Sequence, residues 1–254
     1  MVKPAIIFNN MIYAIIADIH ANLAAFTAVL EDIKTRGEIE EIWCLGDVVG
    51  YGPDPHECIE LLKQHKHVCI AGNHDMGATG KIDTHFFNPD AAAVCQWTSQ
   101  QLSGEDIKYL ENLPTTLEIG DFTLVHGSPR EPTWEYLISI SGAKENFSYF
   151  QSKYCLIGHS HMPLTFHKNE DGVCSFAQFN PDIRQIIGKD RMIINPGAVG
   201  QPRDGNPRAS YAIYDTEIST IRLYRVEYNI EATQNKITKC NLPLPLVSRL
   251  GFGK

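Results

Sequence analysis

Histidine, aspartate and asparagine recur in five short groups along this chain, and these residue types bind metal ions or transfer protons. The groups are Asp18-Ile19-His20, Gly46-Asp47, Gly72-Asn73-His74-Asp75, His126-Gly127 and Gly158-His159-Ser160-His161. Carboxylate oxygens combined with imidazole nitrogens suit Mn, Fe, Zn, Ni or Co, and no thiolate joins the groups. Each group alone also fits a turn, a helix cap or a polar loop. Their recurrence favours a metal site, because turn chemistry alone would not keep selecting ligand types.

Two of the groups place ligand types two residues apart. In an extended segment, residues i and i+2 project to the same side of the chain. We therefore expect Asp18 and His20 to hold one ion together, and His159 and His161 to repeat this arrangement.

Each group directly follows a segment with the pattern of a β-strand. Apolar runs at 11–17, 41–45 and 68–71 alternate with helical spacing at 23–34 and 55–64. This alternation predicts βαβ units and a buried, largely parallel sheet. Because ligands bind at the carboxyl ends of strands in such sheets, the five groups are expected to meet in one crevice.

The second half of the chain has shorter periods that predict a second sheet packed on the first. It follows a predicted pair of helices at 88–113, broken near Ser103-Gly104. Strands are predicted at 116–119, 122–125, 154–157, 164–167, 173–179, 192–194, 210–214 and 221–226, and closing helices at 230–239 and 244–250. At 254 residues, an α/β chain can still share one core. We expect a single domain over 1–254, with a core at about 11–228 and a C-terminal helical extension at about 229–254.

Composition and charge limit the class of partner. The formal charge of −8 disfavours an extended nucleic-acid surface, because binding to the phosphate backbone needs a basic face. The seven cysteines are odd in number and form no C-x-x-C pair, which predicts reduced thiols and a cytoplasmic protein. Asn9 and Asn10 interrupt the apolar run after Lys3, and no segment has the ~20 apolar residues of a membrane span. We expect neither secretion nor a membrane partner.

The ordered pattern D-x-H, G-D, G-N-H-D, H and G-H-x-H resembles the calcineurin-like metallophosphoesterase superfamily, from Asp18 to His161. The segment from Asn195 to Arg203 also resembles a late loop of its compact bacterial members, which extends the match to about residue 214. This resemblance implies an α/β fold, a four-layer α/β/β/α sandwich of two mixed sheets.

The resemblance also implies a cofactor of two divalent metal ions. It places Asp18, His20, Asp47 and His161 on one ion, and Asp47, Asn73, His126 and His159 on the other. Asp47 is then the shared ligand. With Asp18, Asp47 and one hydroxide against two divalent ions, a surplus of about +1 remains, so an acidic protein can still hold an anionic phosphate.

The implied reaction is hydrolysis of a small phosphomonoester or phosphodiester by attack of a metal-bridging hydroxide, with nucleotides or dinucleoside polyphosphates as plausible substrates. Metals about 3.5 to 4 Å apart lower the pKa of bound water toward ~7 and stabilise the charge that builds during attack. His74 is the implied general acid for the departing oxygen. The simpler interpretation is that His74 only hydrogen-bonds Asp75.

One departure concerns the serine/threonine phosphoprotein phosphatases. Their G-D-x-x-D-R-G motif corresponds here to residues 46–52, which lack both the second Asp and the Arg. That Asp orients the catalytic histidine, so protein-phosphatase activity is in doubt, as is close kinship with the symmetrical dinucleoside tetraphosphatases. Two alternatives remain, a serine/threonine protein phosphatase and a catalytically silent interaction module of the same fold. The silent module is disfavoured because His74 and every ligand are present.

Three further residues are candidates for substrate binding. Arg203 and Arg208 could clamp a phosphate, since guanidinium pairs well with phosphate oxygens, or could be solvated loop residues. Tyr51 could stack on a base or pack on its own loop. His65 and His67 have no nearby carboxylate in sequence and are interpreted as surface or strand-start residues, and the same interpretation is given to His56, His85 and His167.

Overall fold

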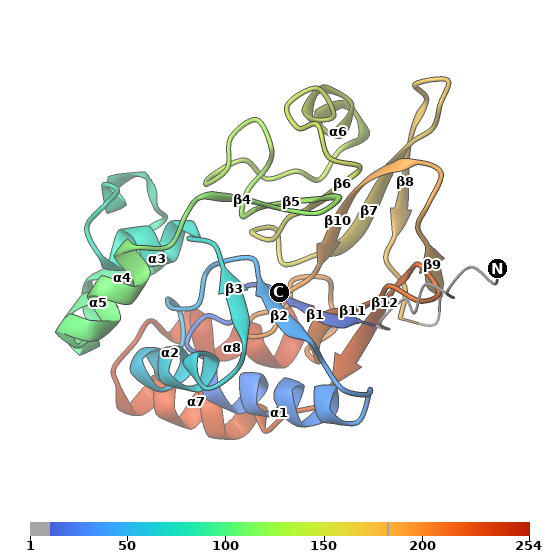
Figure 1. Cartoon of the computed structure of the whole chain (residues 1–254). Helices are drawn as coiled ribbons and strands as arrows, with labels where there is room; N and C mark the ends of the chain where they lie inside the picture. Colours follow the sequence, from blue (N-terminus) through green and yellow to red (C-terminus); the bar gives the residue numbers. More distant parts are fainter. Residues whose placement is uncertain (1–10, 182) are drawn as a thin grey trace.

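Two mixed sheets packed face to face organise this chain, as the computed structural model shows for residues 11–181 and 183–254 (Figure 1). Helices cover the outer face of each sheet, so the order of layers is α/β/β/α, as predicted. The run interrupted by Asn9 and Asn10 lies outside the described residues.

The first sheet combines parallel and antiparallel strands in the order β3-β2-β1-β11-β12-β9. The strands are β1 (Ile12–Ile16), β2 (Glu41–Cys44), β3 (His67–Cys69), β9 (Arg184–Ile186), β11 (Ala209–Asp215) and β12 (Thr220–Val226). The pairs β1–β2 and β2–β3 are parallel, which confirms the predicted βαβ units. Because β11, β12 and β9 then pair antiparallel, the sheet is mixed rather than largely parallel.

The second sheet has the order β4-β5-β6-β10-β7-β8. Its strands are β4 (Thr116–Ile119), β5 (Phe122–Val125), β6 (Tyr154–Leu156), β7 (Pro163–Lys168), β8 (Cys174–Gln178) and β10 (Arg191–Pro196). The pairs β5–β6 and β6–β10 are parallel, and the outer pairs are antiparallel. The carboxyl ends of β5 and β6 therefore face the same edge of the sheet.

The helices are α1 (Leu23–Lys34), α2 (Pro55–Lys63), α3 (Asn73–Ala78), α4 (Pro89–Gln101), α5 (Gly104–Glu111), α6 (Ile140–Asn146), α7 (Ile230–Lys239) and α8 (Leu244–Phe252), with a 3-10 turn at Thr84–Phe86. Local capping explains several starts: Asn22 Oδ1 accepts from Ala25 N, and Ser103 forms a capping box with Asp106. The break between α4 and α5 lies at Ser103, as predicted. The elements α3, α6 and β9 were not predicted, because their residues are mostly polar or small and show no apolar run or apolar spacing.

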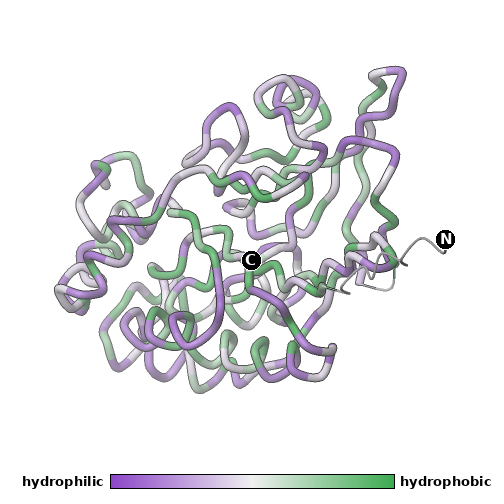
Figure 2. Tube along the Cα trace, in the orientation of Figure 1, coloured by the Kyte–Doolittle hydropathy of each residue, from purple (hydrophilic) through white to green (hydrophobic). Residues whose placement is uncertain are grey.

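The core lies in three apolar layers. Trp43 and Leu45 of the first sheet meet Phe122 and Leu156 of the second between the sheets. A layer under α1 and α2 and another under α6 complete the core. Figure 2 shows the corresponding pattern, with hydrophobic stretches along the central strands and hydrophilic ones in the outer loops.

The two C-terminal helices pack onto this core beside the loop that contains Tyr51. Leu246 and Leu250 are buried in one cluster with Tyr51 and residues of α4. A polar contact also links α7 to the core. Thr233 Oγ1 donates a hydrogen bond to Asn22 Oδ1 at 2.9 Å. Both C-terminal helices therefore contact the elements around Asn22 and Tyr51.

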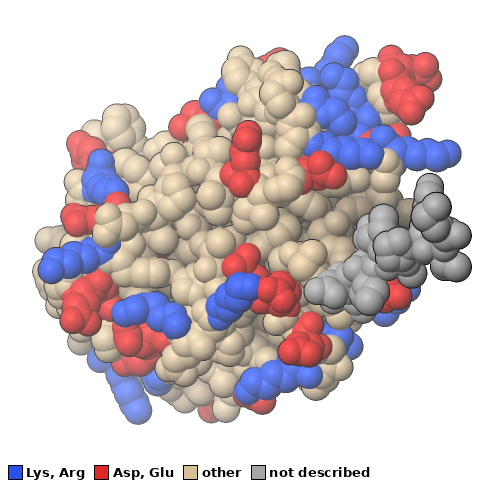
Figure 3. Space-filling model, in the orientation of Figure 1, with Lys and Arg blue, Asp and Glu red and all other residues tan. Residues whose placement is uncertain are grey.

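The surface charges and the state of the cysteines can be compared with the predictions about charge and reduced thiols. On the face shown in Figure 3, Lys and Arg side chains are interspersed with Asp and Glu. All seven cysteines are free, and five of them are buried. Among the residues described, no helix combines the length and apolar character that crossing a membrane requires.

Candidate metal centre

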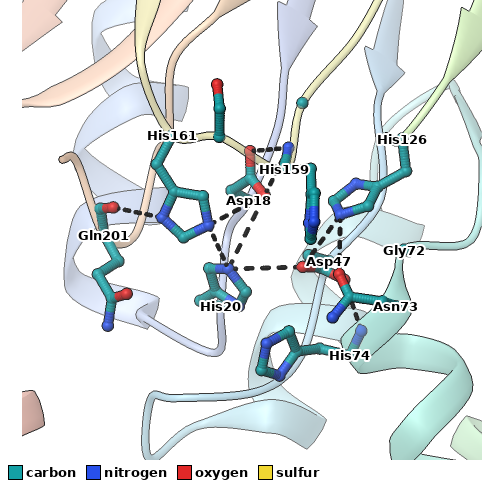
Figure 4. Close-up of polar contacts among 12 residues, drawn as sticks. Asp18, His20, Asp47, Gly72, Asn73, His74, His126, His159, His161 and Gln201 are labelled. Carbon is teal, nitrogen blue, oxygen red and sulfur yellow. Dashed lines mark hydrogen bonds and ion pairs between the residues drawn. The ribbon is translucent and has the colours of Figure 1, made fainter. Parts of the chain in front are cut away.

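The five groups of polar residues meet at one edge of the two sheets (Figure 4). Asp18 follows β1, Asp47 follows β2 and Asn73 begins α3 after β3. His126 follows β5 directly, and the loop after β6 carries His159 and His161. All seven predicted ligands are nearly or fully buried. Convergence at the carboxyl ends of parallel strands brings them together.

The backbone reaches this arrangement in a way that differs from the prediction of extended segments. Asp18, His20, Asp47, His159 and His161 have φ angles of 55°, 49°, 53°, 63° and 57°, in the left-handed region. Such values are uncommon for residues other than glycine and concentrate at functional sites. Hydrogen bonds from tertiary neighbours stabilise them, such as Asp18 N to Gly46 O at 3.0 Å and His20 N to Asp47 O at 2.9 Å. The ligand pairs therefore converge through tight turns, and the extended geometry was wrong.

One cluster joins Asp18, His20 and His161, whose ligand atoms lie within 4.8 Å of one another. Asp18 Oδ1 is 3.3 Å from His161 Nε2 and 3.8 Å from His20 Nε2. Asp47 Oδ2 lies 3.6 Å from His20 Nε2, so the carboxylate of Asp47 borders this cluster.

A second cluster joins Asp47, His126 and His159, whose ligand atoms also lie within 4.8 Å of one another. Asp47 Oδ2 is 3.2 Å from His126 Nε2, and Asn73 Oδ1 is 3.2 Å from the same nitrogen. The same oxygen of Asp47 therefore faces both clusters, and the two sets of neighbours correspond to the two predicted ligand sets.

Backbone carbonyls determine which nitrogen of each histidine faces the clusters. The Nδ1 atoms of His20, His126 and His161 contact the carbonyl oxygens of Val49, Leu45 and Gln201 at 3.1, 2.8 and 2.6 Å, and His159 Nε2 contacts that of Trp134 at 3.1 Å. A carbonyl only accepts, so these nitrogens donate, and in the neutral ring the other nitrogen carries a lone pair. Two such lone pairs, on His20 and His161 Nε2, lie 3.0 Å apart. A cation shared between them fits this donor set.

The carboxylate of Asp47 offers a second test of fit. Oδ1 accepts from His74 N at 2.8 Å, whereas Oδ2 is buried and has no hydrogen-bond partner. A buried acceptor without a donor is costly unless an ion or water satisfies it. Its place between the two clusters suits a carboxylate that bridges two cations.

Burial and ion pairing control the protonation of the site. Burial lowers the pKa of His159 to about 3 and the pKa values of His20 and His161 well below the usual range, so these rings are neutral, as metal ligation requires. At His126, interaction with the Asp47 carboxylate outweighs burial and raises the pKa to about 10, so a bound cation would have to displace the Nε2 proton. Burial also raises the pKa of Asp18 to about 8, which shows how costly its charge is in this environment. A bound cation would favour the ionised form of Asp18.

His74 lies beside the clusters at the start of α3. Its ring centroid is 4.9 Å from that of His20, and burial lowers its pKa to about 4. The neighbouring Asp75 carboxylate instead accepts three backbone N–H groups, from Asp47, Val49 and Gly72. In the described contacts, the Asp75 carboxylate therefore binds backbone N–H groups, and it makes no hydrogen bond to the His74 ring.

The three candidates for substrate binding have different environments. Tyr51 is only 5% exposed, and its ring centroid is 4.3 Å from that of His74. The guanidinium of Arg203 lies 5.5 Å from the Tyr51 ring centroid and bonds to Gln201 Oε1 at 2.8 Å. Arg208 is exposed, and its guanidinium bonds to Asn206 rather than to a described site residue. The structure brings Tyr51 and Arg203 to the centre and leaves Arg208 outside it.

Sequence reasoning missed three residues that line the centre. Tyr136 stacks on His159 with ring centroids 4.0 Å apart, and Phe87 contacts the His74 ring at 5.0 Å. Cys95 Sγ lies 3.6 Å from His74 Nδ1. None of the three belongs to a ligand-like group, so the sequence contained no local signal for them.

The comparison with known proteins agrees with this geometry. The family model described as the calcineurin-like phosphoesterase superfamily domain matches residues 11–219. The chain is 40% identical to an uncharacterized protein of Methanocaldococcus jannaschii over 247 residues, which covers 95% of this chain and 98% of that protein. It is 44% identical to a metallophosphoesterase from Sphaerobacter thermophilus of known crystal structure, with a TM-score of 0.87 and coverage of 97% and 100%.

A more distant relative is the symmetrical bis(5'-nucleosyl)-tetraphosphatase of Haemophilus ducreyi. It is 26% identical over 152 residues, which covers 54% of this chain and 52% of that protein. The match therefore spans about half the length of each protein. Together with the family match over most of the chain, the strand-end motifs and the two-sheet fold show that this chain belongs to the calcineurin-like phosphoesterase superfamily.

Proposed function

We propose that this protein hydrolyses a small phosphomonoester or phosphodiester with the help of two divalent metal ions. The ions would be held by Asp18, His20, Asp47 and His161, and by Asp47, Asn73, His126 and His159. The observation that carries the proposal is the buried, unpartnered Oδ2 of Asp47, which faces imidazole nitrogens of both clusters. When bound, two such ions would orient the phosphoryl group, activate the attacking water and offset the developing charge.

The side chains would prepare the site before substrate arrives. The carbonyl contacts hold the imidazoles of His20, His126 and His161 in one tautomer, so little reorganisation is needed on binding. His74 forms a third group of possible ligands with His20 and Asp47, but the family's pattern gives it no ligand role. Its place beside both clusters suits a proton donor for the leaving oxygen. Burial lowers the pKa of His74 to about 4, so the resting ring is neutral. Proton donation would need the imidazolium, which an anionic phosphoester bound beside the ring would favour.

The proposed substrates are nucleotides or dinucleoside polyphosphates. The distant relative named as a tetraphosphatase supports this class. Arg203, beside the centre, would pair with a phosphate oxygen. Tyr51 is buried against the histidines and α8, so we assign it to packing that positions His74 and Arg203. Arg208 would reach only a substrate that extends out of the crevice.

We also infer the metal, the location and the domain organisation. Manganese suits the mixed carboxylate and imidazole donors, as do Fe, Zn, Ni and Co. A cytoplasmic location follows from the seven free thiols. The packing of α7 and α8 on Asn22 and Tyr51 supports a single domain over the whole described chain.

The test is hydrolysis of bis-p-nitrophenyl phosphate and of diadenosine tetraphosphate by metal-stripped protein with and without added Mn²⁺. We expect activity only with metal, loss of activity in Asp47→Ala, and a fall of about 10²- to 10⁴-fold on the tetraphosphate in His74→Ala. The control is His85→Ala, an exposed histidine outside the centre. Metal-independent hydrolysis would refute the proposal.

Other outcomes would support the alternatives. Turnover of a phosphopeptide faster than any nucleotide would indicate a serine/threonine protein phosphatase. An absence of both bound metal and turnover over a broad panel of phosphoesters would indicate a silent interaction module.

A further inference from the structure

A cysteine from another helix contacts one ring nitrogen of His74. Cys95 of α4 is 1% exposed, and its Sγ lies 3.6 Å from His74 Nδ1, within hydrogen-bonding range for sulfur. The two residues are 21 positions apart in sequence, so the contact depends on how α4 packs against α3.

The loop after β2 leaves space for this contact. Gly50 stands where the G-D-x-x-D-R-G motif of the serine/threonine phosphatases has its second Asp. A Cβ at Gly50 would lie 2.5 Å from His74 Nδ1, and the φ angle of Gly50 is +93°. A carboxylate at this position therefore cannot hold the ring in its present place.

Among the described residues, the other neighbours of the ring make no hydrogen bond to Nδ1, although His20 and Asp47 also lie close to the ring. Tyr51 and Phe87 contact the ring through their aromatic faces and edges. The carboxylate of Asp75 is engaged by backbone N–H groups. Within residues 11–181 and 183–254, the polar side-chain contact recorded for His74 Nδ1 is that of Cys95.

We infer that Cys95 is a positioning residue for His74, a role that rests on the proposed function. The thiol holds Nδ1 toward α4, so Nε2 is the nitrogen left to face the leaving oxygen. When bound substrate favours the imidazolium, the Nε2 proton passes to the leaving oxygen and the ring returns to its neutral form. Burial raises the pKa of the Cys95 thiol to about 12, and the thiol therefore keeps its proton and can donate it to Nδ1. Because a thiol is a weak donor, the effect of removing it belongs at the low end of the range for positioning groups.

The kinetic test compares Cys95→Ala with wild type on two phosphoesters of equal charge, one releasing p-nitrophenolate and one releasing an alkoxide. A good leaving group departs without a proton, whereas an alkoxide needs one. We expect kcat to fall about 10-fold on the alkyl ester and less than about 2-fold on the nitrophenyl ester, with KM unchanged for both. The matched control is Cys58→Ala, a fully buried cysteine on α2 away from the centre.

A second measurement reads the ring directly and does not depend on turnover. NMR of the imidazole nitrogens in metal-free protein should show one His74 tautomer, protonated on Nε2, in wild type and in Cys58→Ala. In Cys95→Ala, the His74 signals should shift or split. Unchanged His74 signals, or equal kinetic losses on both esters, would overturn the inference. Complete inactivity of the wild type would instead refute the proposed function, while the NMR result would still decide the role of Cys95.

Discussion

Replacing Asp47 with asparagine tests whether the Asp47 carboxylate bridges two metal ions or only stabilises the loop after β2. Asparagine keeps the side-chain shape, and its oxygen can still accept from His74 N, as Oδ1 does at 2.8 Å. The substitution removes the negative charge from the buried oxygen that faces both clusters. The expected effect is therefore on metal binding rather than on the fold.

The magnitude follows from linkage. Metal at about 100-fold above its Kd stabilises the folded state by about 2.7 kcal/mol per site. For a chain of this length, that corresponds to a rise in Tm of about 5–10 °C. Losing one unit charge about 4 Å from a divalent cation, at an effective dielectric constant of about 20, costs about 8 kcal/mol, or roughly 10⁶-fold in Kd. At the same metal concentration, Asp47→Asn should then gain less than ~0.1 kcal/mol and less than ~1 °C.

The assay is thermal unfolding of metal-stripped protein with and without Mn²⁺, in which the increment caused by metal is compared between variants. The control is Asp106→Asn, because Asp106 is also buried and also has an oxygen without a hydrogen-bond partner, but lies on α5. The Asp106→Asn variant should have a different Tm without metal, but Mn²⁺ should raise its Tm by as much as it raises that of the wild type. A wild type without any increment, or an Asp47→Asn variant that retains it, would refute the reasoning.

Three further predictions concern packing, backbone geometry and pH. Leu246→Ala, which empties a fully buried position beside Tyr51, should lower the free energy of unfolding in urea by about 2–5 kcal/mol, and a loss below 1 kcal/mol would contradict the packing of α8. Gly50→Ala should lower kcat at least about 10-fold with metal content unchanged, because its Cβ would displace His74; normal kcat would show that the ring has another resting place. His56 bonds to Asp106 at 2.8 Å, which raises the pKa of this half-exposed histidine. The pair's stabilisation is thus complete below the ordinary pKa of about 6.5 and disappears as pH rises through the raised value, so His56→Gln should lower Tm more at about pH 5.5 than at about pH 9.

Much of the site could be predicted because the relevant information is local. An apolar run that ends just before Asp18 or before Gly46-Asp47 predicts a strand and places the polar residue at the strand's carboxyl end. Parallel neighbours then bring such ends together without knowledge of side-chain packing. The pairing of β11 with β1 was not predictable in this way, because antiparallel pairing between distant segments leaves no periodic signal in either one.

The left-handed turns at the ligands could not be predicted for a different reason. Local preference opposes a positive φ at Asp18 or His159, and only hydrogen bonds from distant segments hold it there. Sequence spacing therefore gave the wrong local geometry. It also paired His159 with His161, whereas the structure places His161 with Asp18 and His20, and His159 with Asp47 and His126.

The sequence by itself determined the alternation of β1, α1, β2, α2 and β3, the residue types at the strand ends and the chemistry they permit. The tertiary structure alone decided that Cys95 contacts His74, that Tyr136 covers His159, and that Arg203 rather than Arg208 lies beside the centre. Each of these contacts depends on the relative placement of elements from separate parts of the chain. That placement is set by the packing of apolar layers over the whole fold, and no single segment of the sequence determines this packing.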